Sequence, residues 1–139
     1  MAGYEFMPMR TIQTAFPTIL VVANDPKFLK FLDMALKLEF ECAVLSVTGG
    51  RSAVETAERV KPDLFIIDYH LLDLDALELS LRLHSIKEIE NVPTIVLNSP
   101  VTSWSKPQKY HTIFLTMPFE LEDFYSAVNE NLGLNRCIL

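Results

Sequence analysis

The chain has 139 residues, of which half are hydrophobic and 22% are charged, a composition typical of a single globular domain rather than a disordered or fibrous protein. Its net charge of −6 and its lack of a basic cluster argue against nucleic acid as a partner, because binding to a phosphate backbone depends on grouped Lys and Arg residues. The two distant cysteines, Cys42 and Cys137, lack metal-binding spacing and are expected to be reduced thiols in a cytoplasmic protein.

Residues 1–17 contain scattered apolar side chains that are interrupted by Pro8 and Arg10. A secretory signal or a membrane span needs a longer apolar run, so no membrane partner is expected and the segment is interpreted as an extension before the domain. It is either a loose arm or an arm whose apolar side chains dock on this chain or on a partner.

The first strand is predicted at Ile19–Val22, and Asp25 and Pro26 follow it closely. Asp at the N-cap and Pro at the first helical position favour a helix start, because the carboxylate accepts orphan amides and proline lacks only a donor that the helix does not use. Apolar residues then follow at helical spacing, namely Phe28, Phe31, Leu32, Ala35 and Leu38.

A second strand is predicted at Ala43–Val47, followed by a short helix that starts at the Gly49-Gly50 turn and ends before Pro62. The side chains of this helix that are expected to face inward are Ala53, Val54, Ala57 and Val60.

The central strand is predicted at Leu64–Ile67, an uninterrupted apolar run typical of a parallel strand that is covered on both faces. Asp68 ends the run with a carboxylate. Asp75 can cap a helix that extends to about Lys87, with Glu78 completing an acidic version of the capping box. An ionisable group is thus expected at the carboxyl end of a strand, where ligands bind in open α/β sheets.

Two further strands are predicted at Thr94–Leu97 and Thr112–Leu115. The segment 98–111 between them has two prolines and no helical face, so at most one or two helical turns are expected there. A final helix is predicted to end at Gly133. Its apolar residues are Leu121, Phe124, Tyr125, Val128 and Leu132. This alternation of strands and helices predicts right-handed βαβ units and a parallel sheet.

Several strand ends are expected to meet at the carboxyl edge of this sheet. The residues concerned are Ala23, Asn24 and Asp25, Asp68 to His70, Asn98 and Ser99, and Met117-Pro118. No GxGxxG or Walker loop follows the first strand, so a dinucleotide or nucleoside triphosphate site is not expected, although a flavin site without that motif stays open. The three histidines, His70, His84 and His111, lack ligand spacing and are interpreted as solvated or hydrogen-bonded surface residues.

Four segments resemble, in order and spacing, the receiver domain of two-component response regulators. They are VVANDP, PDLFIIDYHLLDLDALEL, VPTIVLNS and FLTMPF, and the resemblance covers residues 18–132. It implies an α/β, flavodoxin-like (CheY-like) fold with a doubly wound, five-stranded parallel sheet of order 2-1-3-4-5. The fourth family helix is expected to be short or missing, because Pro100 and Pro107 restrict that connection. The domain is placed at residues 18–133, with a tail at 134–139.

In that family the aspartate after the third strand is phosphorylated by a histidine kinase, and the matching residue is Asp68. The other site positions depart from the family pattern. Ala23 and Asn24 stand where two acidic residues hold Mg²⁺, Asn98 replaces a Thr or Ser, and Met117 replaces a Lys before a proline. The resemblance also implies a cis peptide at Met117-Pro118. Further departures are Leu72 and Ala76 for Pro and Gly, and Phe114 at a switch position.

These departures imply at most weak Mg²⁺ binding and no other cofactor. The possible ligands that remain are Asp68, the His70 carbonyl and the Asn24 amide. Removing two charges near 4 Å from the ion costs very roughly 4 kcal/mol apiece at an effective dielectric of 20. Without the Lys, a phosphoryl group also lacks its cationic partner, so phosphotransfer and product stability should both suffer.

We therefore expect a stand-alone, receiver-like signalling domain that acts by protein–protein interaction with little or no phosphorylation and is no enzyme beyond weak self-phosphotransfer. The alternative is a working receiver that a histidine kinase phosphorylates on Asp68, because that carboxylate is either a residual phosphoacceptor or a group that binds loop amides.

A small-molecule pocket lined by Met117, Phe119 and Tyr69 is a third possibility. Met117 is expected to fill the space of the family Lys, and Trp104 to pack the short connection. With no output domain expected after Leu132, the partners are a histidine kinase, another signalling protein or a second copy.

Overall fold

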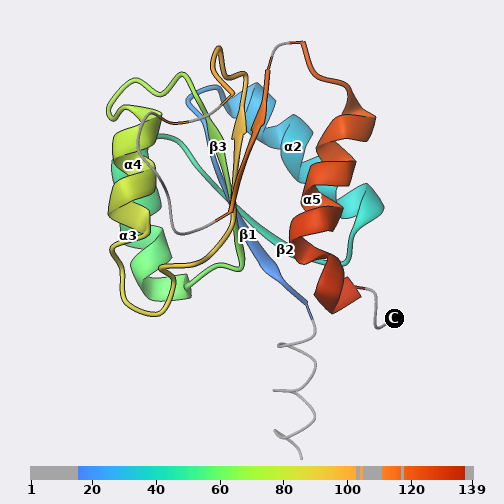
Figure 1. The fold of residues 1–139 in the computed structure, drawn as a ribbon, viewed down its shortest axis with the longest axis horizontal. Coiled ribbons are helices and arrows are strands. Elements are labelled where there is room, and N and C mark those ends of the chain that lie inside the picture. Colours follow the sequence, from blue (N-terminus) through green and yellow to red (C-terminus); the bar gives the residue numbers. More distant parts are fainter. Residues whose placement is uncertain (1–15, 103, 105–110, 117, 137–139) are drawn as a thin grey trace, which may run out of the picture.

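The apolar runs of the sequence form a five-stranded parallel sheet of order β2-β1-β3-β4-β5 in the computed structural model, which describes residues 16–102, 104, 111–116 and 118–136 (Figure 1). The strands are β1 (Thr18–Val22), β2 (Ala43–Val47), β3 (Leu64–Asp68), β4 (Thr94–Leu97) and β5 (Thr112–Leu115). The helices of the described residues are α2 (Pro26–Glu39), α3 (Gly50–Val60), α4 (Ala76–Leu83) and α5 (Leu121–Arg136). The α/β flavodoxin-like fold predicted from the sequence is thereby confirmed.

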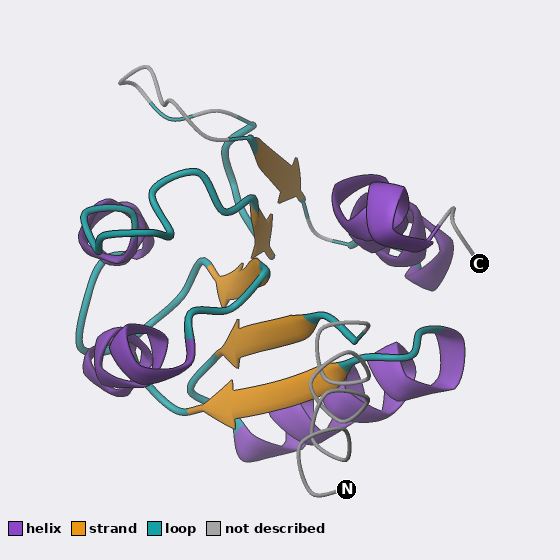
Figure 2. Cartoon of the chain, turned by 90° about the horizontal axis from the view of Figure 1, so that it is seen from below, coloured by secondary structure: helices purple, strands orange, loops and turns teal. Residues whose placement is uncertain are grey.

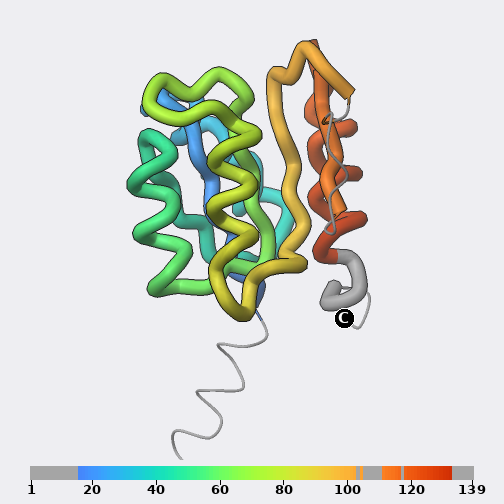
Figure 3. The backbone as a smooth tube through the Cα atoms, turned by 60° about the vertical axis from the view of Figure 1, so that its left-hand side comes forward, coloured from blue at the N-terminus to red at the C-terminus, as the bar shows by residue number. Residues whose placement is uncertain are grey.

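The helices cover both faces of the sheet, α2 and α5 on one and α3 and α4 on the other (Figures 2 and 3). Successive side chains of a strand point to opposite faces, and β1 shows this clearly: Ile19 and Val21 enter the core under α2 and α5, while Leu20 and Val22 enter the core under α3 and α4. Both cores consist of buried apolar side chains, which explains why the central strands are apolar throughout.

The strand register fixes which residues share the carboxyl edge. Ile67 lies beside Val22, and Asp68 lies beside Leu97. Asn24 and Asn98 therefore lie just beyond the strand ends, next to Asp68.

Helix α2 starts as predicted, because Asp25 is its N-cap and one carboxylate oxygen accepts from the Lys27 amide at 2.9 Å. The apolar residues that fall at helical spacing are not all buried. Phe31 and Leu38 are 48% and 81% exposed. The buried residues are instead Leu29, Leu32, Ala35 and Leu36. The helix has apolar residues on most of its circumference, so spacing alone did not distinguish the two stripes.

Helix α3 buries Ala53 and Ala57 as predicted, but Val60 is 39% exposed at the helix end. Helix α5 continues through Gly133 to Arg136, so the predicted end at Gly133 is wrong. A glycine inside a helix costs only about 1 kcal/mol relative to alanine, and burial of apolar side chains such as Leu132 in the preceding turn outweighs that cost.

Helix α4 departs from the prediction at both ends. Asp75 occupies the N-cap position, but its side chain makes no capping hydrogen bond, and Glu78 pairs with Arg82 at 2.8 Å instead of completing a capping box. The helix ends at Leu83 rather than near Lys87. A side chain binds a carbonyl in the last turn of the helix, since His84 Nδ1 lies 2.7 Å from the Ser80 carbonyl oxygen.

None of the described residues in the connection between β4 and β5, which are 98–102, 104 and 111, is helical. The expectation of a short or missing helix is confirmed. Trp104 packs edge-on against Phe114, with ring centroids 4.9 Å apart, as predicted for a packing residue. No helix in the described ranges is both long and apolar enough to cross a bilayer.

Candidate functional site

Asp68 is half-buried at the carboxyl end of β3, where the sequence places the candidate phosphoacceptor. Its Oδ1 atom accepts from the His70 amide at 3.2 Å and from Asn98 Nδ2 at 3.5 Å. The second distance is at the limit of a hydrogen bond, so the Asn98 contact is weak. Oδ2 accepts no hydrogen bond from the described residues.

Asn98 is placed by an unusual backbone conformation, with φ of 57°. Asparagine tolerates this left-handed region better than most residues, and the turn directs its amide toward Asp68. Ser99 is buried and holds the following turn, because its hydroxyl donates to the Val101 carbonyl at 2.6 Å. An amide donor thus takes the place of the expected hydroxyl at the end of β4.

Asn24 reaches from the end of β1 to the loop after β3. Its Nδ2 atom donates to the His70 carbonyl at 2.9 Å. The sequence suggested Asp68, the His70 carbonyl and Asn24 as the remaining Mg²⁺ ligands, and the structure does bring these three residues together. However, an amide N–H faces the carbonyl oxygen that would have to turn toward the ion.

The donor set around Asp68 does not fit a divalent cation. Ala23 contributes only a buried methyl group, and the Asp25 carboxylate is turned to the amino end of α2. Among the described residues, no three His, Cys, Asp or Glu side chains gather closely enough to hold a metal ion. Mg²⁺ requires near-octahedral oxygen ligands, of which this edge offers one carboxylate.

Asp73, which the sequence reasoning missed, ties the loop after β3 to α3. Its two carboxylate oxygens accept from the amides of Gly50 at 2.8 Å and Arg51 at 3.1 Å. These backbone hydrogen bonds lower the pKa of Asp73 from its ordinary value. A signal was present, since α3 starts at Gly49 and Gly50 without a side chain of its own to cap it.

The glycines allow this close approach. Gly49 has φ of 99°, and a Cβ on Gly50 would come within 2.9 Å of the Leu74 side chain. The loop from Tyr69 to Asp75 is therefore fixed at two points, by Asn24 near its start and by α3 near its end.

The histidines do not assemble a site. His70 is exposed beside Tyr69, and His111 lies 3.9 Å from Glu130. His84 is half-buried at the end of α4, with its Nε2 atom 2.7 Å from the Val92 carbonyl. Burial lowers the pKa of His84, and its hydrogen bonds to the Val92 and Ser80 carbonyls partly offset this effect.

Met117 and Cys137 lie outside the described residues. The same therefore holds for the predicted replacement of the family Lys by Met117 and for the Met117-Pro118 peptide bond. The other two residues of the suggested small-molecule pocket pack on different faces of the sheet: Tyr69 contacts the core under α3 and α4, and Phe119 contacts the core under α2 and α5. The structure gives this pocket no support.

Comparisons with known proteins agree with this geometry at the level of the fold. No protein-family model matches the chain. Over 82 residues it is 30% identical to the "Probable transcriptional regulatory protein TcrX" of Mycobacterium tuberculosis, a match that covers 59% of this chain and 34% of that protein. The match therefore spans about a third of the length of this curated relative.

Solved receiver domains superpose well on the chain. The receiver domain of a signal transduction histidine kinase from Syntrophus aciditrophicus is 25% identical, with a TM-score of 0.70 over 84% of this chain and 90% of that chain. The receiver domain of sensor histidine kinase PA1611 from Pseudomonas aeruginosa, with a magnesium ion in its active-site cleft, is 21% identical, with a TM-score of 0.72 over 85% and 98%. Chemotaxis response regulator CheY4 of Vibrio cholerae is 16% identical, with a TM-score of 0.74 over 84% and 99%. The chain has the fold of response regulator receiver domains.

Proposed function

We propose that this chain is a receiver-like signalling domain of a two-component pathway that binds a partner protein and undergoes little or no phosphorylation. The observation that carries this proposal is the set of contacts around Asp68. The aspartate is retained at the end of β3, but two side-chain amides bind the oxygens around it. Asn24 donates to the His70 carbonyl, and Asn98 donates to Asp68 Oδ1.

Weak Mg²⁺ binding is part of the proposal. An ion bound through the His70 carbonyl would compete for that oxygen with the hydrogen bond from Asn24, an interaction of about 1 kcal/mol. The missing carboxylate charges are a larger effect, very roughly 4 kcal/mol each at an effective dielectric of 20. Phosphoryl transfer depends mainly on positioning and on stabilising charge, so a site with one carboxylate is poorly suited to it.

The alternative function, phosphorylation of Asp68 by a histidine kinase, also has an observation in its favour. Asp68 Oδ2 accepts no hydrogen bond from the described residues, and the side chain is only half-buried. An accessible carboxylate oxygen is the minimum that a phosphoacceptor needs. The two functions differ in chemistry and can be separated by one experiment.

The partner in this proposal is a histidine kinase or another signalling protein. Two of the similar solved structures are receiver domains of histidine kinases, and this supports a partner of that class. The chain has no catalytic role in the proposal beyond weak self-phosphotransfer, and its cytoplasmic location stays a prediction from the sequence.

The test is incubation of the purified chain with acetyl phosphate and MgCl₂, followed by intact mass spectrometry. Asp68→Asn serves as the control, because it keeps the shape of the side chain and removes the nucleophilic carboxylate. We expect no phosphoryl adduct on either protein. An adduct on the parent that is absent from Asp68→Asn would refute the proposed function and establish the alternative.

A further inference from the structure

A groove runs along the outer edge of the sheet, between α2 and β2. It consists of two open hollows, of about 430 Å³ and 450 Å³, that share Lys37 as a lining residue. The first hollow is lined by Phe16 and by Ala43, where β2 begins, and the second by Val44 and Ser46, further along the same strand. We call this the β2 groove, and it follows the edge strand along most of its length.

β2 is the outermost strand on this side, and its outer backbone groups have no partner strand among the described residues. The Ala43 amide donates inward, to the Pro17 carbonyl at 2.9 Å. Backbone groups alternate in direction along a strand, so those of Val44 and Ser46 point outward, into the β2 groove. A row of open donors and acceptors of this kind can pair with one further strand.

We propose that residues 9–13 of the amino-terminal extension occupy the β2 groove as a sixth strand, antiparallel to β2. The first described residue is Phe16, which lines the groove beside Ala43. The extension therefore joins the domain at the end of the groove where β2 begins. A segment that enters there and follows the edge runs in the direction opposite to β2.

The length of the extension sets the register of this pairing. Two strand spacings of about 4.8 Å separate β1 from the position outside β2, and about three extended residues span that distance. Residues 14–16 make this crossing. Gln13 then lies opposite Ala43, and Met9 lies opposite Val47 at the other end of the strand.

The sequence of the extension fits this placement. Residues 9–15 lack proline and glycine, and Thr11 and Ile12 are β-branched residues that favour strands. Pro8, which has no amide to donate in a strand pair, lies just beyond the end of β2. Directly opposite residues of an antiparallel pair share a face, so Ile12 lies beside Val44, on the face that α2 covers.

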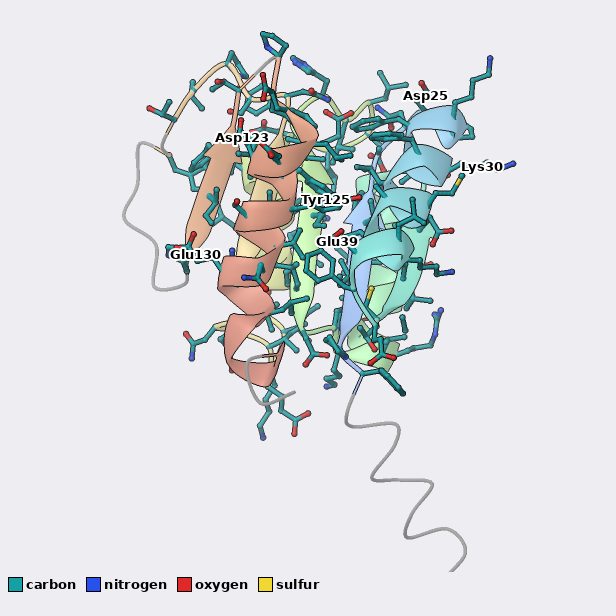
Figure 4. The ribbon with its side chains drawn as sticks, turned by 90° about the vertical axis from the view of Figure 1, so that its right-hand side faces the viewer. Asp25, Lys30, Glu39, Asp123, Tyr125 and Glu130 are labelled. Atoms are coloured by element: carbon teal, nitrogen blue, oxygen red, sulfur yellow. The ribbon has the colours of Figure 1, made fainter. Side chains whose placement is uncertain are left out.

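The charges along the β2 groove also match the extension. Lys30 and Asp33 line the second hollow, and Lys30 forms no ion pair with any described residue. Figure 4 shows Lys30 on the side of α2 that faces away from α5. Arg10 lies opposite Ser46 in the proposed register, in the hollow that contains Asp33. Glu5, the one acidic residue of the extension, follows toward the start of α2, where it can offset the charge of Lys30.

Other arrangements fit less well. A second copy or a partner peptide must bind from solution, whereas the chain itself holds the extension at the groove, at an effective concentration on the order of millimolar. To reach the other edge of the sheet, outside β5, the extension would have to cross four strand spacings, about 19 Å, from β1. That crossing would use about six residues and bring Pro8 into the pairing segment.

The first test is amide hydrogen exchange by NMR on the full chain. We expect the Val44 and Ser46 amides to exchange about tenfold more slowly in the parent than in Ile12→Pro, because that proline removes a donor that faces β2. Gln13→Pro is the matched control. The amide of residue 13 faces away from β2, where an edge strand tolerates proline, so protection should be kept. The Leu45 amide, which faces β1, should exchange at the same rate in all three proteins.

The second test is NOE spectroscopy on a mixture of ¹³C-labelled and unlabelled chains, which separates contacts within one chain from contacts between copies. We expect a contact between the α-protons of Gln13 and Ala43 within one chain, because such opposite residues of an antiparallel pair lie close together. Circular dichroism of each variant verifies that the fold is retained.

Several results would overturn the proposal. They are rapid exchange of the Val44 and Ser46 amides in the parent, equal rates in the parent and Ile12→Pro, and loss of protection in Gln13→Pro. NOE contacts between copies would overturn it as well, because they would assign the edge to a second copy. The inference goes beyond the proposed function, and no phosphoryl chemistry enters its readouts. The outcome of the phosphodonor test therefore leaves it unaffected, and the two proposals fall separately.

Discussion

Replacing Asp73 by alanine should destabilise the domain through the amino end of α3. The carboxylate accepts from the Gly50 and Arg51 amides at 2.8 and 3.1 Å, so Asp73→Ala leaves two helix-end donors to water. Loss of a capping side chain typically costs about 0.5–2 kcal/mol, and the two bonds to a charged acceptor place Asp73 in the upper half of that range. We expect a loss of about 1–2 kcal/mol in the free energy of unfolding, or about 3–6 °C in Tm.

The matched control is Asp75→Ala. Asp75 occupies the N-cap position of α4, two residues further along the same exposed loop, but its side chain makes no capping hydrogen bond. Its replacement should change the free energy of unfolding by less than about 0.5 kcal/mol. Urea unfolding followed by circular dichroism measures both variants. Equal losses in the two variants would contradict the assignment of Asp73 as the cap of α3.

The Asp73 contribution should also depend on pH. Its pKa is lowered in the folded state by the backbone hydrogen bonds, so the unfolded chain binds the proton more readily. The contribution is therefore complete above the unfolded pKa, near 3.9, and is lost as the pH falls through the lower folded value. In Asp73→Asn this part of the acid dependence should disappear.

Three further outcomes are expected. The triple variant with Ala23→Asp, Asn24→Asp and Met117→Lys should acquire a phosphoryl adduct on Asp68 that is acid-stable, base-labile and visible by intact mass spectrometry. The two acidic substitutions without the lysine, or the lysine alone, should give no adduct. Both are needed because the metal and the lysine act on the same developing charge. His84→Gln should reduce the loss of stability on acidification below about pH 6.5, since burial lowers the folded pKa of His84 and stability must rise with pH in that window; a parent whose stability is flat there would contradict this. Gly50→Ala should cost about 1 kcal/mol in urea unfolding, because its Cβ would lie 2.9 Å from Leu74, while Arg51→Ala keeps the same backbone donor and should cost less.

The strands were predictable because their signal is local. Ala43–Val47, Thr94–Leu97 and Thr112–Leu115 were predicted to the residue, since each is an apolar run bounded by polar or turn-forming residues. The helix faces were harder. Helix α2 carries one stripe through Leu29, Leu32 and Leu36 and another through Phe31 and Leu38, and only packing decides which of them is buried.

The position of the site was predictable, but its contacts were not. Asp68, Asn24 and Asn98 meet because parallel strands end at the same edge, which follows from topology. The hydrogen bond of Asn24 to His70 joins residues 46 positions apart, and that of Asp73 to Gly50 joins residues 23 positions apart. Contacts between residues so far apart in the chain cannot be predicted from local spacing. The His70 carbonyl, interpreted from the sequence as a possible metal ligand, accepts a hydrogen bond from the Asn24 side chain in the structure.

The edge-on contact between Trp104 and Phe114 gives the chain an optical reporter of its own. Trp104 is the single tryptophan of the sequence, so its fluorescence comes from one known place. That place joins the β4–β5 connection to the ring of Phe114 in β5. Its indole N–H has no hydrogen-bond partner among the described residues, which makes the emission sensitive to water entering around the ring. Rearrangement of this connection by a partner would therefore change the emission of the unlabelled protein.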